Sequence, residues 1–353
     1  MLECELVSPT GPKLSICIPT RNRASFIGAT LESIITQWSP DCEIVVVDGA
    51  SHDETENVVA AWANRCGRLR YVKREVSEGF DRDLDQAVEL ASGEYCWLMS
   101  DDDFIRSGAV ARVLEVVAQN YSLIVGNAEI RDVYMSATTQ ENFLEIVSDR
   151  VFNETELDQL FDQCGLKLCY MGCVIIRRDV WMGRSRHRYF GSYFVHLAVI
   201  FQEPLPGSTL LMSSRLVSVR GGNQSWLAKH FELEMIILPG LVWSFPLSEA
   251  VQRRASSARP WARFGLLLRG RGDGLYSLPI YFESFRPRHW SRLQIIGHVL
   301  IAGLPMPIAY VLSLLHHLLT RIYTSTRNRL SRFVGAHFLN SLAVPKRDKR
   351  NIQ

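Results

Sequence analysis

The sequence lacks several patterns that mark common protein classes. Its eight cysteines include no Cys-x-x-Cys pair, and Cys17, Cys42 and Cys96 lie inside apolar runs. This excludes a disulfide framework or a zinc site of the usual spacing and indicates reduced core cysteines. The opening residues contain no apolar stretch, so we expect no signal peptide and a protein that stays inside the cell. There is no internal repeat and no low-complexity tract.

Charge is nearly balanced over the whole chain but not along it. The 353 residues carry a formal net charge of +2, with 47% hydrophobic and 22% charged residues, enough to bury a sizeable core. Residues 251–353 hold 17 Lys or Arg against 3 Asp or Glu, a net charge of +14, whereas residues 1–250 carry −12. An acidic body argues against nucleic-acid binding, and a basic tail predicts an anionic partner.

The first 130 residues alternate short β-rich runs with amphipathic helical patterns. Apolar side chains fall on one helical face at Ile27, Leu31 and Ile34, and again at Leu84 and Val88. Such alternation predicts an α/β fold with a mostly parallel sheet, right-handed crossovers and ligands at the carboxyl ends of the strands. The predicted strands are 14–18, 43–47, 69–72, 95–99 and 122–125, and a later apolar strand is 173–176.

Polar residues follow three of these strands. The first strand runs into Pro19-Thr20-Arg21-Asn22-Arg23, the second into Asp48, and the fourth into Ser100-Asp101-Asp102-Asp103. Three consecutive carboxylates repel one another unless a cation sits among them. Oxygen ligands with open positions suit Mg²⁺ or Mn²⁺ beside a diphosphate. The alternative is an acidic turn that caps the next helix.

Asp48 and Arg82 are further candidates, each with a simpler alternative. Asp48 can read a nucleoside by hydrogen bonds, or it can cap the helix that begins near Glu54. Arg82 can reach a phosphate, or it can pair with Asp85 on its own helix.

Three segments together resemble a known family. LSICIPTRNRASFIGATLESIITQ, EIVVVDGASHDET and EGFDRDLDQAVELASGEYCWLMSDDD resemble, in order and spacing, the family-2 glycosyltransferases of the GT-A fold. The resemblance covers roughly residues 1–130. GEYCWLMSDDD, with the later GSYFVH and RGGNQSW, is most similar to the O-antigen branch that includes abequosyltransferase-like enzymes. The resemblance implies a nucleotide-sugar donor, a divalent metal, inversion at the anomeric carbon and a role in surface polysaccharide synthesis.

The resemblance also implies roles for individual residues. Pro19, Thr20, Arg21 and Asn22 would lie along the nucleotide. Asp48 would contact the base or ribose and Arg82 the base or diphosphate, while Asp102 and Asp103 would hold the metal and Asp101 the donor-sugar side. Ser100 stands where many members have the first Asp of Asp-x-Asp, which leaves open which two carboxylates touch the metal.

Inversion in one displacement needs a base for the acceptor hydroxyl proton. Many relatives place this base in a Glu-Asp pair, and Gly191-Ser192-Tyr193-Phe194-Val195-His196 stands at the corresponding place here. His196 is therefore the predicted base, with Asp101 as a second catalytic residue and Asp162 and Asp179 in reserve. The alternative for His196 is a buried histidine bonded to backbone.

RGGNQSW follows the apolar run 210–219 and supplies the acceptor-side candidates. Paired glycines allow close backbone approach, and Asn223 and Trp226 offer a polar group and a stacking face for a sugar. The alternative is a plain turn with an anchoring tryptophan.

The predicted organisation is a GT-A domain over 1–226 and a basic helical region over 227–353. Residues 1–130 would form the nucleotide-sugar-binding half of the domain, and residues 131–226 the acceptor half. Residues 293–320 contain no Lys, Arg, Asp or Glu. Pro305 and Pro307 should break this stretch into two arms, each too short to cross a bilayer.

Flanking arginines then predict an apolar hairpin at the cytoplasmic face of the inner membrane, held there as a peripheral or monotopic protein. That position would favour a polyprenyl-diphosphate-linked glycan as acceptor. The alternative is a buried helical hairpin.

Two other functions compete with an inverting glycosyltransferase. A sugar nucleotidyltransferase uses a similar sheet, but it usually has a Gly-rich loop after the first strand, where this chain has PTRNR. A non-catalytic membrane-surface binding module would share the fold without turnover.

Overall fold

The computed structural model describes residues 11–223, 229–286 and 291–319. The chain divides into two compact units. The first unit comprises Met1–Leu227 and Ile237–Ala258, and the second comprises Ala228–Ile236 and Arg259–Gln353. The predicted boundary after residue 226 differs from this division, because residues 237–258 belong to the first unit.

Helices α9 (Leu238–Ser244) and α10 (Glu249–Ala255) join the first unit by packing on α5 (Leu157–Cys164). The Ser248 amide donates to Asp158 Oδ1 at 3.0 Å, and the rings of Phe245 and Phe161 lie 6.3 Å apart, edge to face. The apolar residues of 237–258 thus have partners in the first unit.

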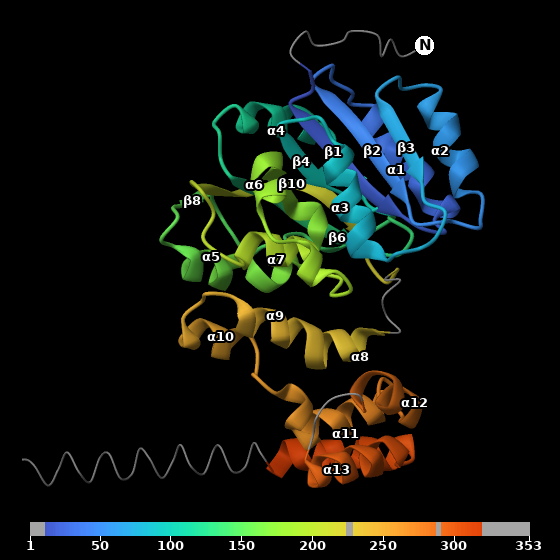
Figure 1. Cartoon of the computed structure of the whole chain (residues 1–353), viewed down its shortest axis with the longest axis vertical. Helices are drawn as coiled ribbons and strands as arrows, with labels where there is room; N and C mark the ends of the chain where they lie inside the picture. Colours follow the sequence, from blue (N-terminus) through green and yellow to red (C-terminus); the bar gives the residue numbers. More distant parts are fainter. Residues whose placement is uncertain (1–10, 224–228, 287–290, 320–353) are drawn as a thin grey trace, which may run out of the picture. The chain divides into compact units, whose positions relative to one another are not determined.

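A single sheet forms the centre of the first unit (Figure 1). Its main path runs β3-β2-β1-β4-β9-β6-β10-β5, with β7 paired to β6 and β8 paired to β10. Strands β1 to β4 are parallel, and β6 is parallel to β10, whereas β9 is antiparallel to both of its neighbours. The strands are β1 (Leu14–Thr20), β2 (Cys42–Asp48), β3 (Leu69–Lys73), β4 (Tyr95–Leu98), β5 (Phe104–Ile105), β6 (Leu123–Arg131), β7 (Thr138–Gln140), β8 (Arg150–Phe152), β9 (Val174–Arg177) and β10 (Thr209–Arg220).

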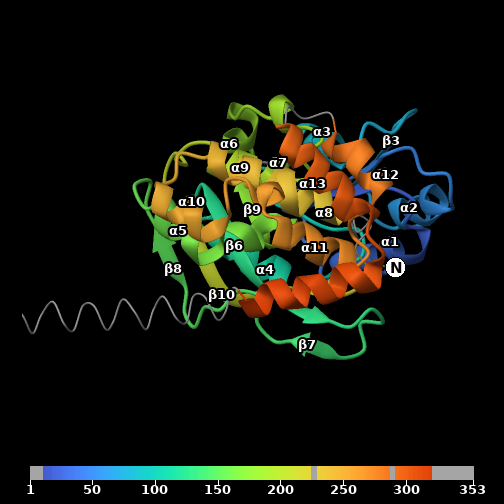
Figure 2. The same cartoon turned by 90° about the horizontal axis from the view of Figure 1, so that it is seen from below.

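The predicted α/β class is confirmed, and the predicted strands lie within about two residues of the observed ones, except that β6 runs on to Arg131. The order β3-β2-β1-β4 reverses direction at β1, so right-handed crossovers place α1 and α2 on one face of the sheet and α3 on the other. Figure 2 shows β7 and β8 at the margin of this unit.

The helices bury their apolar stripes against the sheet. In α1 (Ala24–Ile35), Ile27, Leu31 and Ile34 are buried, as the periodicity predicts. The other helices of the first unit are α2 (Thr55–Ala63), α3 (Phe80–Leu90), α4 (Ala109–Val117), α6 (Arg178–Gly183) and α7 (Val195–Phe201).

The second unit is helical. It contains α8 (His230–Glu232), α11 (Phe264–Gly272), α12 (Leu278–Ile280) and α13 (Arg292–Gly303), and a further helical stretch over residues 306–319. The predicted break at Pro305 is confirmed, because Leu304 is extended and helical backbone resumes at 306. Among the helices that the structure describes, none is both long and apolar enough to cross a membrane.

Candidate active site

The loops after β1 and β4 meet at one edge of the sheet. These strands are parallel neighbours, with Leu14 opposite Tyr95 and Cys17 opposite Leu98, so their carboxyl ends point the same way. Arg23, after β1, lies between two carboxylates that follow β4. Its Nε is 3.4 Å from Asp101 Oδ1, and its Nη2 is 3.9 Å from Asp102 Oδ2.

The end of β10 completes this group from the other side. The Arg220 amide donates to Asp103 Oδ1 at 2.6 Å, and its guanidinium Nε donates to the Asp102 carbonyl at 3.0 Å. Asn223 Nδ2 donates to Asp102 Oδ2 at 2.8 Å. Three chain segments that are far apart in sequence therefore converge on the three carboxylates.

Burial shapes the electrostatics of this group. Asp101 and Asp102 are each 8% exposed and Asp103 is 2% exposed. Burial raises the pKa of Asp101 to about 7, against the lowering effect of Arg23. Burial, followed by the charge of Asp102, raises the pKa of Asp103 to about 8. The sequence predicts a cation among these carboxylates, and the Arg23 guanidinium supplies part of that positive charge.

Asp103 is the most firmly held of the three. Tyr170 donates its hydroxyl to Asp103 Oδ2 at 2.9 Å, and burial with the Asp103 charge raises the pKa of Tyr170 well above its ordinary value. Asp102 instead accepts the Ser100 hydroxyl at 2.6 Å and the Asn223 amide, both on side chains that can turn away. Asp101 and Asp102 are therefore better able to face a ligand than Asp103.

The donor set fits a hard divalent cation only in part. Carboxylate oxygens suit Mg²⁺ and Mn²⁺, which are commonly held by one or two carboxylates together with substrate phosphates. Within residues 11–223, 229–286 and 291–319, no group of three or more His, Cys, Asp or Glu side chains could hold a metal ion. A metal at this edge would need oxygen ligands from a bound diphosphate.

Arg23, Arg220, Tyr170 and Ser100 were not predicted as site residues. Arg23 and Arg220 stand within the motifs PTRNR and RGGNQSW, and both guanidinium groups lie over the Phe26 ring, at 5.4 and 5.2 Å from its centroid. The presence of an arginine inside each motif was the sequence feature that could have identified them as site residues. Nothing in the sequence distinguishes Tyr170.

Asp48 lies at the end of β2, fully buried, and does not cap α2, whose N-cap is Glu54. Its Oδ1 accepts the Ser51 amide at 2.8 Å, and its Oδ2 accepts the Tyr71 hydroxyl at 2.6 Å. Asp48 therefore fixes the turn after β2, and the helix-cap alternative is wrong.

The loops after β1 and β2 are bonded to each other. The Asn22 amide donates to Ser51 Oγ at 2.8 Å, and the His52 amide donates to Asn22 Oδ1 at 2.9 Å. Asn22 and Ala50 have φ of 54° and 64°, a left-handed conformation that non-glycine residues adopt mainly where the surroundings hold it. Pro19 and Thr20 are buried beneath these loops, whereas Arg21 and Asn22 are exposed.

Asp81, Asp83 and Asp85 on α3 are buried, and each contacts a different segment of the chain. Asp81 accepts the amides of Tyr193 and Val195, at 2.8 and 3.0 Å, and burial raises its pKa to about 6. Asp83 pairs with Arg74 at 2.9 Å. A Cβ at Gly49 would lie 2.3 Å from Asp83 Oδ2, so the turn after β2 requires glycine there.

Arg82 is exposed on the same helix. Its guanidinium lies 5.0 Å from the Phe190 ring centroid and 3.8 Å from Glu78. Asp85 does not pair with Arg82, because it accepts from Trp181 Nε1 at 2.7 Å and Arg186 Nε at 2.6 Å. The Arg82–Asp85 alternative is wrong, and Arg82 remains accessible to a ligand.

His196 matches the alternative given for it, a buried histidine bonded to backbone. It lies in α7 with 1% exposure, and its Nε2 bonds to the Leu168 carbonyl at 2.9 Å. Burial lowers its pKa to about 4, so it is neutral and a weak base at neutral pH. An acceptor hydroxyl cannot reach His196 in this structure, which argues against the predicted role of His196 as the base.

The reserve carboxylates are engaged elsewhere. Arg177 pairs with Tyr95 at the start of β4, so neighbouring Asp179, ion-paired to Arg177, lies at the edge opposite Asp101. Asp162, on α5, is paired with Arg254 at 2.5 Å. Trp226, the second acceptor-side candidate, lies outside the described residues.

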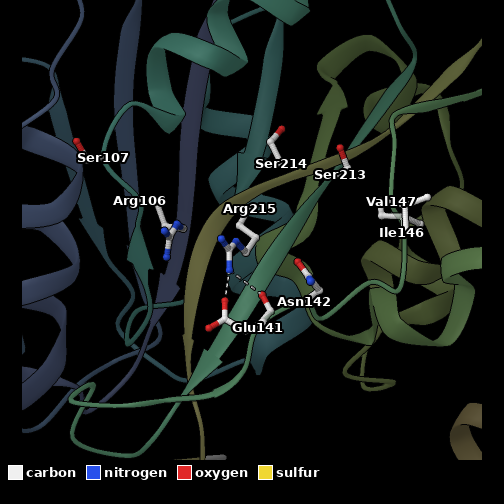
Figure 3. Close-up of a pocket in the computed structure, with 9 residues that line it drawn as sticks. All are labelled: Arg106, Ser107, Glu141, Asn142, Ile146, Val147, Ser213, Ser214 and Arg215. Carbon is white, nitrogen blue, oxygen red and sulfur yellow. Dashed lines mark hydrogen bonds and ion pairs between the residues drawn. The ribbon is translucent and has the colours of Figure 1, made fainter.

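An open groove of about 820 Å³ lies elsewhere on the first unit, where β10 bulges away from β6 (Figure 3). Arg215 points at Glu141 across it and forms an ion pair. None of the three edge carboxylates lines this groove. Its lining residues are Arg106, Ser107, Glu141, Asn142, Ile146, Val147, Ser213, Ser214 and Arg215.

Comparisons with solved structures agree with the observed fold. The S. aureus TarS structure has a TM-score of 0.53 at 16% identity, over 81% of this chain and 52% of that chain. A shorter TarS structure in complex with UDP gives 0.50 at 17% identity, over 68% of each chain. At such identities the likeness concerns the fold alone, a central sheet with flanking helices that matches GT-A glycosyltransferases.

Sequence relatives point the same way. The chain is 27% identical over 230 residues to abequosyltransferase RfbV of Salmonella typhimurium, covering 61% of this chain and 69% of that protein. It is 32% identical over 120 residues to a GalNAc(5)-diNAcBac-PP-undecaprenol beta-1,3-glucosyltransferase of Campylobacter jejuni, covering 34% and 39%. Residues 15–182 match the family model "Glycosyl transferase family 2". The resemblance seen in the sequence is thereby confirmed, and residues 15–182 of this chain carry a family-2 glycosyltransferase domain.

Proposed function

We propose that the first unit transfers a sugar from a nucleotide-sugar donor, with inversion, to a lipid-linked glycan during surface polysaccharide or O-antigen synthesis. The observation that carries the proposal is the junction of Arg23 with Asp101 and Asp102 at one sheet edge, with separations of 3.4 and 3.9 Å. A guanidinium binds phosphate oxygens directly, and carboxylates bind them through a cation.

The nucleoside part of the donor would lie against the interlocked loops after β1 and β2. Arg21 and Asn22 are exposed there and can donate to it directly. Asp48 acts in this proposal by fixing the turn at Ser51 and Tyr71, as well as by any contact with the base or ribose. Arg82, accessible at the start of α3, is a candidate contact for the base or diphosphate.

Mg²⁺ or Mn²⁺ would be held by Asp102 together with oxygens of the donor diphosphate, in place of the predicted pair Asp102 and Asp103, which leaves Asp101 free of the cation. Such a cation supplies positive charge for the leaving diphosphate. The chain's own residues contact both carboxylates: Ser100 and Asn223 donate to Asp102, while Arg23 opposes the rise in the pKa of Asp101 that burial causes.

The acceptor would approach from the end of β10. Asn223 contacts Asp102 at 2.8 Å, which supports the assignment of this segment to the acceptor side. Inversion requires a group that takes the acceptor proton, and Asp101 remains as the catalytic candidate at the described edge. A polyprenyl-diphosphate-linked acceptor is supported by the C. jejuni relative, whose name includes undecaprenol diphosphate.

Donor turnover tests the proposal. The purified chain is incubated with UDP-, CDP-, GDP- and dTDP-sugars and Mn²⁺, with and without a polyprenyl-diphosphate glycan, and nucleoside diphosphate release is measured. Asp102→Asn should abolish release, while Glu115→Gln, which removes an exposed carboxylate on α4, should leave it unchanged.

The anomeric configuration of the product, read by NMR, should be opposite to that of the donor. Retention would contradict inversion. Absence of turnover with every donor would favour a non-catalytic binding module, and pyrophosphate release from a nucleoside triphosphate and a sugar phosphate would favour a nucleotidyltransferase.

A further inference from the structure

The second unit exposes an unusual number of large apolar side chains. In the first unit, the exposed large aliphatic and aromatic residues of the described ranges are scattered along the chain, as at Val76, Tyr134 and Val147. In the second unit they are concentrated on α13 and residues 306–319, which we call the apolar hairpin. Leu293, Leu300 and Leu319 are 79%, 65% and 66% exposed. Such a concentration of exposed apolar side chains is typical of a binding surface.

The inner side of the apolar hairpin is packed on α11 (Figure 1). A Cβ at Gly272 would lie 2.8 Å from Tyr310 Cα, and one at Gly265 would lie 2.3 Å from the His316 ring. On the other arm, a Cβ at Gly297 would lie 2.6 Å from the Phe264 ring. Glycines thus let both arms approach α11 closely. The side chains that point away from α11 stay exposed.

Buried hydrogen bonds hold this arrangement. His298 is fully buried, with its Nδ1 2.7 Å from the Tyr276 hydroxyl and its Nε2 3.0 Å from the Trp261 carbonyl. Arg271 donates to the Leu304 carbonyl at 2.6 Å and so fixes the turn between the arms. The bare side chains therefore belong to a held structure and not to a loose helix.

Neither arm can span a bilayer. The 12 residues of α13 would measure about 18 Å and the 14 residues of 306–319 about 21 Å, against roughly 30 Å of hydrocarbon. Among its described residues, the same unit exposes more basic than acidic side chains: Lys229, Arg259, Arg263, Arg269, Arg286 and Arg292, against Glu234, Asp273 and Glu283. Aliphatic side chains beside cationic ones are the composition of helices that lie in an anionic membrane interface.

We propose that the apolar hairpin inserts flat into an anionic bilayer surface, which attaches the protein to the cytoplasmic face of the inner membrane without a transmembrane span. The proposed occupant of the bare face is lipid, because the unit that carries the apolar hairpin also exposes an excess of cations that match anionic headgroups. This inference does not depend on the sugar-transfer proposal, since it concerns residues outside the first unit.

Vesicle flotation tests it with the full-length chain. Wild-type protein should float with vesicles of phosphatidylcholine and phosphatidylglycerol, bind pure phosphatidylcholine far less, and be released only partly by high salt. The triple variant Leu293→Ser/Leu300→Ser/Leu318→Ser should lower the partition coefficient about 100-fold or more, at roughly tenfold for each aliphatic residue that inserts. Because these side chains are exposed, the variant should keep its melting transition.

Val147→Ser, which removes a fully exposed valine from the first unit, is the matched control and should bind vesicles like wild type. If the triple variant loses its melting transition, the single variant Leu300→Ser is used and should weaken binding about tenfold. Nucleoside diphosphate binding is measured on every variant, so that failure of this proposal is distinguished from failure of sugar transfer.

Three outcomes would overturn the proposal. Wild-type protein that stays unbound with anionic vesicles would do so, as would equal flotation of the triple variant. A wild-type dimer that the triple variant abolishes, without vesicle binding, would show that a second copy covers the hairpin.

Discussion

Replacing Arg23 by methionine should destabilise the first unit and sharpen its response to a divalent cation. The guanidinium lies 3.4 Å from Asp101 and 3.9 Å from Asp102, and its side chain is 15% exposed. At an effective dielectric constant of about 20, the nearer contact corresponds to roughly 5 kcal/mol of Coulomb energy, part of which offsets desolvation. Removing one partner of a buried pair typically costs about 3–5 kcal/mol. We expect a loss of about 3 kcal/mol in the free energy of unfolding.

Urea unfolding in EDTA measures this loss, followed by fluorescence and circular dichroism. Arg112→Met is the control, because Arg112 is 44% exposed and pairs with Glu115 at 3.1 Å on the surface, where such pairs contribute about 0–1 kcal/mol. Mn²⁺ should then stabilise Arg23→Met more than wild type, since the variant lacks the cation that shares the carboxylates. A variant as stable as wild type in EDTA, or an equal gain from Mn²⁺ in both proteins, would refute the reasoning.

Three further predictions follow from buried groups. His196→Gln should lower the unfolding free energy by about 1–3 kcal/mol, because the Leu168 carbonyl loses its partner, yet leave turnover per folded molecule nearly unchanged; a large fall in turnover would restore His196 as the base. Arg186→Met leaves Asp85 buried beside Trp181 without its cation and should cost about 3–5 kcal/mol by urea unfolding, whereas Arg253→Met on the surface of α10 should cost less than about 1 kcal/mol. Burial lowers the pKa of His298 to about 4, so the unfolded state binds this proton first as the pH falls below about 6.5. The contribution of His298 to stability should therefore fall by about 3 kcal/mol between pH 6.5 and 4, and in thermal melts of the full chain His298→Gln should lose less stability than wild type over that range.

The sequence predicts the strand ends well because each strand is a buried apolar run that stops at a polar turn. Parallel pairing then dictates that residues after β1 and β4 share an edge, which is why Asp101, Asp102 and the PTRNR motif were found together. The partners that arrive from β10 could not be derived in this way. Arg220 reaches Asp103 because β5, which begins directly after Asp103, pairs antiparallel with β10, and no local pattern encodes that pairing.

The burial of His196, which argues against its predicted role as the base, has a signal in the sequence. Every residue of α7 (VHLAVIF) is buried, and a short helix that is apolar all round belongs to a core, where a histidine is desolvated and neutral. The prediction of His196 as the base rests on its position relative to the family motif and not on this pattern of burial. The predicted boundary after residue 226 differs from the observed division for a similar reason. Residues 237–258 have the sequence pattern of the helical tail, and only the contact with α5 assigns them to the first unit.

The central claim is that the carboxyl edge of β1 and β4 binds a nucleoside diphosphate through Asp102 and a divalent cation. Calorimetric titration of UDP, CDP, GDP and dTDP into the purified protein tests it most directly, with Mn²⁺, with EDTA and with Asp102→Asn. We predict that one of these nucleotides binds the wild-type protein in Mn²⁺. Its binding should be at least tenfold weaker in EDTA and at least tenfold weaker to Asp102→Asn, a loss of about 1.4 kcal/mol or more in each case. Equal binding in all three conditions, or no binding of any of the four nucleotides, would contradict it.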